Sequence, residues 1–257
     1  MDHGKLGITI GDDYVTTIEI RKPPNNHIDI DIVDGLIETL NDLDEDPRCR
    51  AIVLCSEGKH FCAGADFRRD GSTEAEGIGN RSVYDEAEKL FATRTPIVAA
   101  VQGAAVGAGL GLAMVADFRV AAPEARFSAN FARLGFHHGF VLSATLPRAI
   151  GHQRALEMLY TGQRLKGDEA LAIGLADRLA PLAQVREVAH QLAVEIATSA
   201  PLAVESIRQT MRGDLTDLVR TVKEREMGEQ AWLRTTNDWV EGVAAMAERR
   251  TPNFTRS

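Results

Sequence analysis

Residues 96–117 read PIVAAVQGAAVGAGLGLAMVAD, and this stretch decides which fold the chain adopts. Residues 97–116 are long and apolar enough for a membrane span, with Gln102 as the only polar side chain. The stretch is mostly glycine and alanine, however, Pro96 opens it, and the sequence offers no second span to pack against it. A buried strand followed by a buried helix explains this composition better than a membrane segment does.

The charge balance limits the classes of partner. The chain has 257 residues, with 29 Lys and Arg against 37 Asp and Glu, for a net charge of −8. This length suits one large domain with a sizeable core. The negative charge argues against nucleic acid and against an anionic membrane surface as partners.

The cysteines and the N-terminus bear on the compartment. Cys49, Cys55 and Cys62 form no C-x-x-C pair, so we expect neither a disulfide framework nor a zinc site. The first residues, MDHGKLGITIGDD, have no apolar run behind a basic start and do not resemble a signal peptide. We therefore expect a cytoplasmic protein without a metal.

The predicted elements repeat in the order strand, strand, helix. Residues 8–10 and 14–20 flank the turn signature GDD and predict a hairpin. Apolar residues from 33 to 43 fall on one face of a helix that starts near Asp31, and AIVLC (51–55) reads as a short buried strand. PIVAAV, the glycine-rich segment, a helix through Met114 and the strand FRVAA then follow. This order predicts a layered α/β domain.

The chain becomes helical after Pro181. Helices are predicted over 185–198, 202–211 and 214–250. Their apolar faces include Leu215, Leu218, Val219, Val222, Trp232 and Trp239. Such an apolar helical region usually covers the domain or joins subunits. We divide the chain into a core domain, residues 1–195, and a C-terminal helical region, residues 196–257.

Two loops follow buried strands, and both are rich in glycine and alanine. SEGKHFCAGADF (56–67) follows AIVLC, and QGAAVGAGLG (102–111) follows PIVAAV. Backbone approaches a ligand closely at such loops, and the second loop enters a helix whose first amides have no partner within the helix. Two such amides on one carbonyl oxygen would form an oxyanion hole. The alternative is that the small residues only permit close helix packing. A dinucleotide site is excluded, because the third small residue of G-x-G-x-x-G is missing.

Longer motifs resemble one family through almost the whole chain, in order. They are HFCAGADF (60–67), TPIVAAVQGAAVGAGLGLAMVADFRVAAPEARF (95–127), LPRAIGHQRALEMLYTGQRLKGDEALAIGLADRL (146–179) and EGVAAMAERRTPNF (241–254). With these motifs the chain resembles the crotonase superfamily, the enoyl-CoA hydratase/isomerase fold. The resemblance implies a spiral of strand-strand-helix repeats with a C-terminal helical trimerisation region. It also implies a homotrimer or a hexamer built as a dimer of trimers.

The resemblance implies an acyl-CoA thioester as substrate, with coenzyme A as part of that substrate and no permanently bound cofactor. The thioester carbonyl would lie between the backbone amides of Ala65 and Ala108. Neighbouring residues of the two loops would contact the substrate: Ala63, Gly64, Asp66 and Gly107. Basic residues that would meet the CoA phosphates are Lys22 and Lys59 foremost, with Arg21, Arg68, Arg69 and Arg250 as further candidates.

The chain departs from the family at two positions. Hydratases of this family carry one glutamate after the glycine loop and a second further on, and these act as acid and base on the added water. The matching positions are Gly111 and Phe131, neither of which can move a proton. Both would still line the acyl group. The resemblance thus implies a member that lacks both usual catalytic glutamates.

Other side chains are candidates to replace the glutamates. His137 and His138 in LGFHHGF occupy a turn that lines the acyl pocket in the family, and imidazole titrates near neutral pH. His138 is the first candidate for the acid or base. Polar residues that would orient a substrate or water, or reach in from the variable segment, are Ser128, Asn130, Ser143, Asp85, Glu86 and Glu88. Cys62 reads as a small buried residue.

Two functions remain at this point. The first is an acyl-CoA enzyme, nominally an enoyl-CoA hydratase, that passes through a thioester enolate and performs C–C cleavage, isomerisation, decarboxylation or hydrolysis. The second is an acyl-CoA-binding carrier or sensor with the same fold and no catalysis. The same pair of absent glutamates favours both over ordinary hydration.

Overall fold

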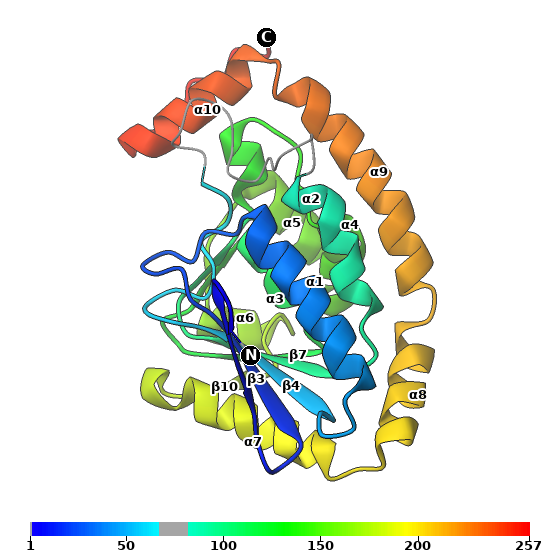
Figure 1. Cartoon of the computed structure of the whole chain (residues 1–257). Coiled ribbons are helices and arrows are strands. Elements are labelled where there is room, and N and C mark those ends of the chain that lie inside the picture. Colours follow the sequence, from blue (N-terminus) through cyan, green and yellow to red (C-terminus); the bar gives the residue numbers. More distant parts are fainter. Residues whose placement is uncertain (1, 67–81) are drawn as a thin grey trace.

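The computed structural model describes residues 2–66 and 82–257 (Figure 1). Arg68 and Arg69, two of the predicted phosphate contacts, lie outside the described residues. The strands are β1 (Asp2–His3), β2 (Leu6–Ile10), β3 (Val15–Ile20), β4 (Ala51–Ser56), β5 (Ile97–Val101), β6 (Ala104–Val106), β7 (Phe118–Ala121), β8 (Arg126–Ser128), β9 (Leu165–Lys166) and β10 (Arg178–Leu179). The helices are α1 (Ile30–Glu45), α2 (Val83–Glu86), α3 (Ala108–Val115), α4 (Leu142–Ile150), α5 (His152–Thr161), α6 (Gly167–Ala172), α7 (Val185–Ala197), α8 (Pro201–Arg212), α9 (Leu215–Leu233) and α10 (Asn237–Glu248). Short 3₁₀ helices are η1 (Ala87–Ala92), η2 (Asn130–Leu134) and η3 (Leu182–Gln184).

Two sheets form the centre of the chain. The larger has the strand order β1-β2-β3-β4-β5-β7-β10, and the smaller has the order β6-β8-β9. The predicted hairpin is β2 and β3, which pair antiparallel, whereas β3, β4, β5, β7 and β10 run parallel. The order β2-β3-α1 is the predicted strand-strand-helix order, and β5-β6-α3 repeats it. The sequence did not predict β6, which lies inside the glycine-rich segment and begins the second sheet.

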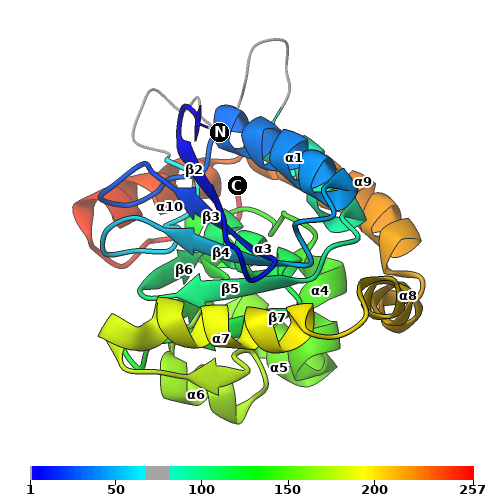
Figure 2. The ribbon, with the colours of Figure 1, turned by 60° about the horizontal axis from the view of Figure 1, so that its bottom comes forward.

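Both faces of the larger sheet are buried. Strand residues alternate between two apolar clusters, as the two-residue period of a strand requires. On one face Val53 and Val98 pack against Ala189 and Leu192 of α7. On the other face the alternate residues belong to the main core, together with the apolar side of α1. Figure 2 shows the strands between α1 and α7.

The stretch that opened the sequence analysis is a strand and a helix, as predicted. It forms β5, β6 and α3, all eight residues of α3 are buried, and Gln102 donates to the Ser56 carbonyl at 2.8 Å. Among the described residues, none of the helices has the length and apolarity needed to cross a membrane.

The C-terminal helices depart from prediction in two ways. The helix predicted over 214–250 is interrupted between α9 and α10, where the Thr236 hydroxyl accepts from the Trp239 amide at 3.1 Å and caps the new helix. Trp232 does not lie on the buried face: it is 55% exposed, and its indole donates to Glu229 at 2.7 Å. The predicted domain boundary at residue 195 falls two residues before the end of α7 and stays a prediction, as do the oligomer and the compartment.

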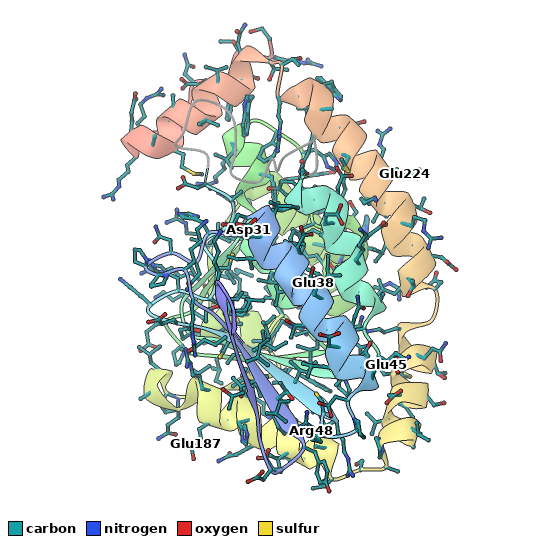
Figure 3. The ribbon with its side chains drawn as sticks, viewed as in Figure 1. Asp31, Glu38, Glu45, Arg48, Glu187 and Glu224 are labelled. Carbon is teal, nitrogen blue, oxygen red and sulfur yellow. The ribbon has the colours of Figure 1, made fainter. Side chains whose placement is uncertain are left out.

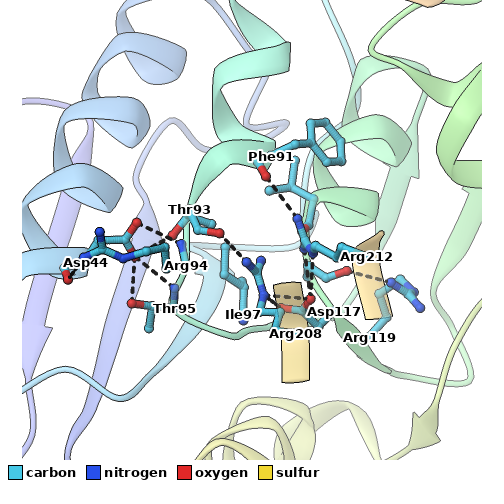
Figure 4. A network of polar contacts seen from close by, with 12 residues as sticks. Asp44, Phe91, Thr93, Arg94, Thr95, Ile97, Asp117, Arg119, Arg208 and Arg212 are labelled. Carbon is cyan, nitrogen blue, oxygen red and sulfur yellow. Dashed lines mark hydrogen bonds and ion pairs between the residues drawn. The ribbon is translucent and has the colours of Figure 1, made fainter. Parts of the chain in front are cut away.

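A partly buried cluster of ion pairs joins α8 to the core (Figure 4). Asp117 accepts from the Ile97 amide at 2.9 Å, from Arg208 Nε at 2.9 Å and from Arg212 Nη2 at 2.9 Å. Arg212 also donates to the Val115 carbonyl at the end of α3. Burial alone would raise the pKa of Asp117, but Arg208 and Arg212 outweigh it and lower the pKa below its ordinary value.

We expect Asp117→Ala to lower the free energy of unfolding by about 1–3 kcal/mol, because it leaves two partly buried guanidinium groups without their carboxylate. Urea denaturation at neutral pH measures this change. Glu224→Ala is the matched control: Glu224 is exposed on α9 (Figure 3), and its removal should change stability by less than about 0.5 kcal/mol. A loss below about 1 kcal/mol for Asp117→Ala would show that the cluster does not hold α8.

Candidate functional site

The two predicted loops lie side by side. The first loop pairs with β6 in parallel through Cys62 and Ala105. The Cys62 amide donates to the Ala104 carbonyl at 2.8 Å, and the Val106 amide donates to the Cys62 carbonyl at 3.1 Å. Backbone hydrogen bonds therefore hold the segment after β4 against the segment after β5.

Glycines permit this approach. A Cβ atom on Gly109 would lie 2.0 Å from the Cys62 carbonyl oxygen, which is a steric clash. A Cβ atom on Gly64 would lie 2.7 Å from the Val106 carbonyl oxygen, and Gly64 has a φ of +89°. Any other residue at either position would force the loops apart.

The loops present two free amides. Ala108 is the first residue of α3, so its N–H has no acceptor within the helix. Within residues 2–66 and 82–257, neither the Ala108 amide nor the Ala65 amide donates a hydrogen bond to the chain. Both residues line one cavity of about 40 Å³, which exceeds the volume that a single water needs.

The cavity brings residues of both predicted loops together with Asn130 and Phe131. Its lining consists of Ala63, Gly64, Ala65, Tyr84, Val106, Gly107, Ala108, Asn130, Phe131, Leu134 and Met246. The sequence analysis named the loop residues, Asn130 and Phe131, but it missed Tyr84, Val106, Leu134 and Met246. Met246 comes from α10, far along the chain, and no local pattern marks it as a neighbour of these loops.

Gly111 has no room for a side chain. A Cβ atom there would lie 2.5 Å from Cβ of Phe140 and 2.6 Å from its ring. Phe140 is fully buried and has a φ of +59°, so it cannot move aside freely. The benzyl group of Phe140 fills the space into which a side chain from position 111 would project.

We expect Gly111→Ala to destabilise the protein, because the overlap with Phe140 costs about 1–3 kcal/mol and exceeds the helix-propensity gain of about 1 kcal/mol. In a Phe140→Gly background, which removes the Cβ as well as the ring, the overlap is gone, and the same change should stabilise by about 1 kcal/mol. Urea denaturation of the four proteins measures this coupling.

Gly228→Ala supplies the control for the helix-propensity gain. Gly228 lies within α9, and a Cβ atom there meets no atom within 4 Å. This change should stabilise by about 1 kcal/mol. If Gly111→Ala behaves like Gly228→Ala in both backgrounds, Phe140 does not exclude a side chain at position 111.

Phe131 forms one wall of the cavity as part of an aromatic row. Its ring centroid lies 6.5 Å from that of Tyr84 and 5.4 Å from that of Phe136, and Phe136 lies 4.5 Å from Trp239 of α10. Edge contacts of this kind contribute beyond the buried area. The row connects α2 to α10, and at the cavity it presents only apolar surface from position 131.

The histidines lie outside this cavity lining and contact one another. The His137 and His138 rings are stacked at 4.1 Å. His138 Nε2 lies 2.7 Å from Ser143 Oγ and 3.9 Å from Glu226 Oε1. Glu226, on α9, is 2% exposed and accepts from the Val141 and Ser143 amides at 2.9 and 2.8 Å, which caps α4.

Burial shifts both titratable groups toward their neutral forms. It lowers the pKa of His138 to about 3, with a smaller contribution from His137. Burial raises the pKa of Glu226 to about 7, although the Ser143 and Val141 amides oppose this. At neutral pH the imidazole is therefore uncharged, and its 3.9 Å contact with Glu226 is not an ion pair.

The raised pKa of Glu226 makes stability depend on pH. Between pH 4.5 and 7 the folded protein binds a proton at Glu226 that the unfolded chain does not hold, so this contribution is present at low pH and is lost as pH rises through 7. The stability of wild type relative to Glu226→Gln should fall by about 3 kcal/mol from pH 4.5 to 8. His138, which acts in the opposite direction, is common to both proteins. Parallel pH profiles in urea denaturation would contradict a raised pKa.

The predicted phosphate contacts are mostly engaged elsewhere. Lys22 pairs with Asp29 at 2.6 Å, Arg21 pairs with Glu19 at 2.9 Å, and Arg250 pairs with Glu241 and Glu248. Lys59 is exposed and borders a second, larger cavity with Arg126. None of these four cations lines the 40 Å³ cavity.

The predicted acids and the thiol are likewise placed away from it. Glu86 pairs with Lys89 at 2.5 Å, and Glu88 pairs with Lys223 at 3.0 Å. The backbone carbonyl of Asp85 accepts a hydrogen bond from Lys223 Nζ at 3.5 Å. Ser128 donates to the Gly162 carbonyl. Burial raises the pKa of Cys62 to about 11, which agrees with its interpretation as an inert buried residue. Asp66 follows Ala65 and does not line the cavity.

Comparison with known proteins identifies the family. The enoyl-CoA hydratase/isomerase family matches residues 11–257. A putative enoyl-CoA hydratase of Thermus thermophilus is 33% identical over 251 residues, covering 94% of this chain and 97% of the relative. A probable enoyl-CoA hydratase of Bacillus subtilis is 31% identical over 249 residues, covering 95% and 96%.

Solved structures agree. The crystal structure of an enoyl-CoA hydratase/isomerase from Pseudoalteromonas atlantica superposes with a TM-score of 0.88 at 28% identity, covering 98% of this chain and 100% of that one. The two sheets with their surrounding helices thus form the crotonase fold. The chain belongs to the enoyl-CoA hydratase/isomerase family.

Proposed function

We propose that this protein is an acyl-CoA enzyme that holds a thioester carbonyl between the Ala65 and Ala108 amides and stabilises the enolate formed from it. The observation that carries the proposal is the pair of unpartnered amides on one cavity. The dipole of α3 lies behind the Ala108 amide and adds to the stabilisation of negative charge. Preorganised donors of this kind act on charge that develops in the transition state.

The proposed reaction is not ordinary hydration. The resemblance matches the two family glutamates to Gly111 and Phe131, and Phe140 fills the space at the first of these. Among the described residues that line the cavity, none carries a carboxylate. His138 is not the base in this proposal, because an imidazole with a pKa of about 3 accepts protons poorly at neutral pH. C–C cleavage, isomerisation and decarboxylation remain as reactions of the same enolate, and thioester hydrolysis remains as a reaction whose tetrahedral oxyanion the same amides would hold.

We expect Ala108→Pro to slow α-proton exchange roughly 100- to 1000-fold, because proline removes the amide donor while its fixed φ suits the first position of a helix. The measurement is mass spectrometry of saturated, enoyl, β-keto and cyclic CoA thioesters incubated with the protein in D₂O. Ala108→Gly keeps the amide and is the matched control, and binding of free CoA checks that each variant is folded.

Three outcomes separate the alternatives. Exchange or product formation that is lost in Ala108→Pro and kept in Ala108→Gly supports the proposal. Equal rates of exchange in both variants would show that the Ala108 amide does not take part in the reaction. Binding of the thioesters by wild type with neither exchange nor product across the panel would favour a non-catalytic acyl-CoA carrier or sensor.

A further inference from the structure

Tyr84 is a polar side chain in the cavity that the reaction proposed above does not use. It is 3% exposed and lies at the start of α2. Its ring packs edge-on against Phe131, and a Cβ atom on Gly139 would lie 2.6 Å from ring atom Cδ1. These contacts fix the plane of the ring, so the direction of its hydroxyl is fixed as well.

The hydroxyl of Tyr84 is available to a ligand. Within the described residues it has no hydrogen-bond partner, whereas buried tyrosine hydroxyls usually have one. Tyr84 is part of the lining of the cavity, so its side chain borders space that a ligand can occupy. Tyr84 and Ala65 line the same cavity, so the phenol lies near the first loop.

Tyr84 is a donor rather than a base. Burial raises the pKa of its phenol well above the ordinary value, so the O–H keeps its proton at neutral pH. The cavity wall next to it is apolar, with Phe131 and Leu134. Asn130, the other polar side chain of the wall, is half-buried, so water can satisfy its amide. The lone buried O–H therefore selects for an acceptor atom on the substrate.

We propose that the Tyr84 hydroxyl donates a hydrogen bond to a carbonyl oxygen at C3 of the acyl group, and that the substrate is a 3-oxoacyl-CoA. The inference rests on the proposed function, in which the Ala65 and Ala108 amides take the oxygen at C1. A cavity of about 40 Å³ leaves room for only a small group beside that carbonyl, so the second acceptor lies within two bonds of C2. A 3-oxo group presents an acceptor and no donor, which matches the O–H donor of a protonated phenol.

The test compares binding of two CoA analogues in which an amide replaces the thioester: the 3-oxobutanoyl and the butanoyl compounds. Calorimetry should show that wild type binds the 3-oxo compound about tenfold more tightly, the equivalent of about 1.4 kcal/mol. Tyr84→Phe should reduce this preference to about onefold and leave the affinity for the butanoyl compound unchanged. Tyr160→Phe is the matched control, because Tyr160 is 73% exposed on α5, and it should keep the wild-type preference.

A wild-type measurement complements the variant. The chain has three tyrosines, so ¹³Cζ labelling yields three phenol signals. One of them should shift on addition of the 3-oxo compound and not on addition of the butanoyl compound. Tyr84→Phe with an intact preference, no shift in wild type, or tighter binding of a 3-hydroxybutanoyl analogue would overturn the inference. Failure of the proposed function is separate, since it would appear as absent α-proton exchange in wild type.

Discussion

The contact between Gly109 and the Cys62 carbonyl is the constraint on which the rest of the structure depends. With a Cβ atom only 2.0 Å from that oxygen, the two loops could not pair, and β6 would lose its bridge to the first loop. The smaller sheet begins at β6, and α3 begins two residues after it ends. One close approach therefore fixes the start of α3, and with it the Ala108 amide, relative to Ala65.

A site built in this way takes its polar groups from the backbone and leaves the side chains to form walls. Packing then decides what chemistry the same amides support. Phe140 occupies the space beside Gly111, and Phe131 belongs to a row of rings that reaches α10. A carboxylate side chain at position 111 would require the removal of Phe140 in addition to the substitution of Gly111. The space available to a side chain at position 111 is thus set by neighbouring residues of the core.

Sequence reasoning predicted what depends on local pattern. The hairpin, the repeat order and the two loops followed from periodicity and glycine placement, and the grouping of Ala65 with Ala108 came from the family resemblance. Tyr84 and Met246 could not be predicted, because they reach the cavity through contacts between distant segments. Glu226 carried a signal: it falls four residues after Val222 and seven after Val219, on the buried face of α9. A carboxylate on such a stripe indicates a buried acceptor.

The position of Glu226 also bears on where the proton of the reaction goes. Its two oxygens accept from the Val141 and Ser143 amides, and Val141 itself has a φ of +60°, which a β-branched residue adopts only under constraint. Releasing the carboxylate toward a substrate would leave two buried amides without acceptors and loosen the turn before α4. The Glu226 carboxylate therefore serves as an acceptor for backbone amides and is not free to act on a substrate. The enolate proposed for this site is stabilised by donors that keep their protons, so the proton that is lost or gained at C2 has to be exchanged with water rather than with Glu226.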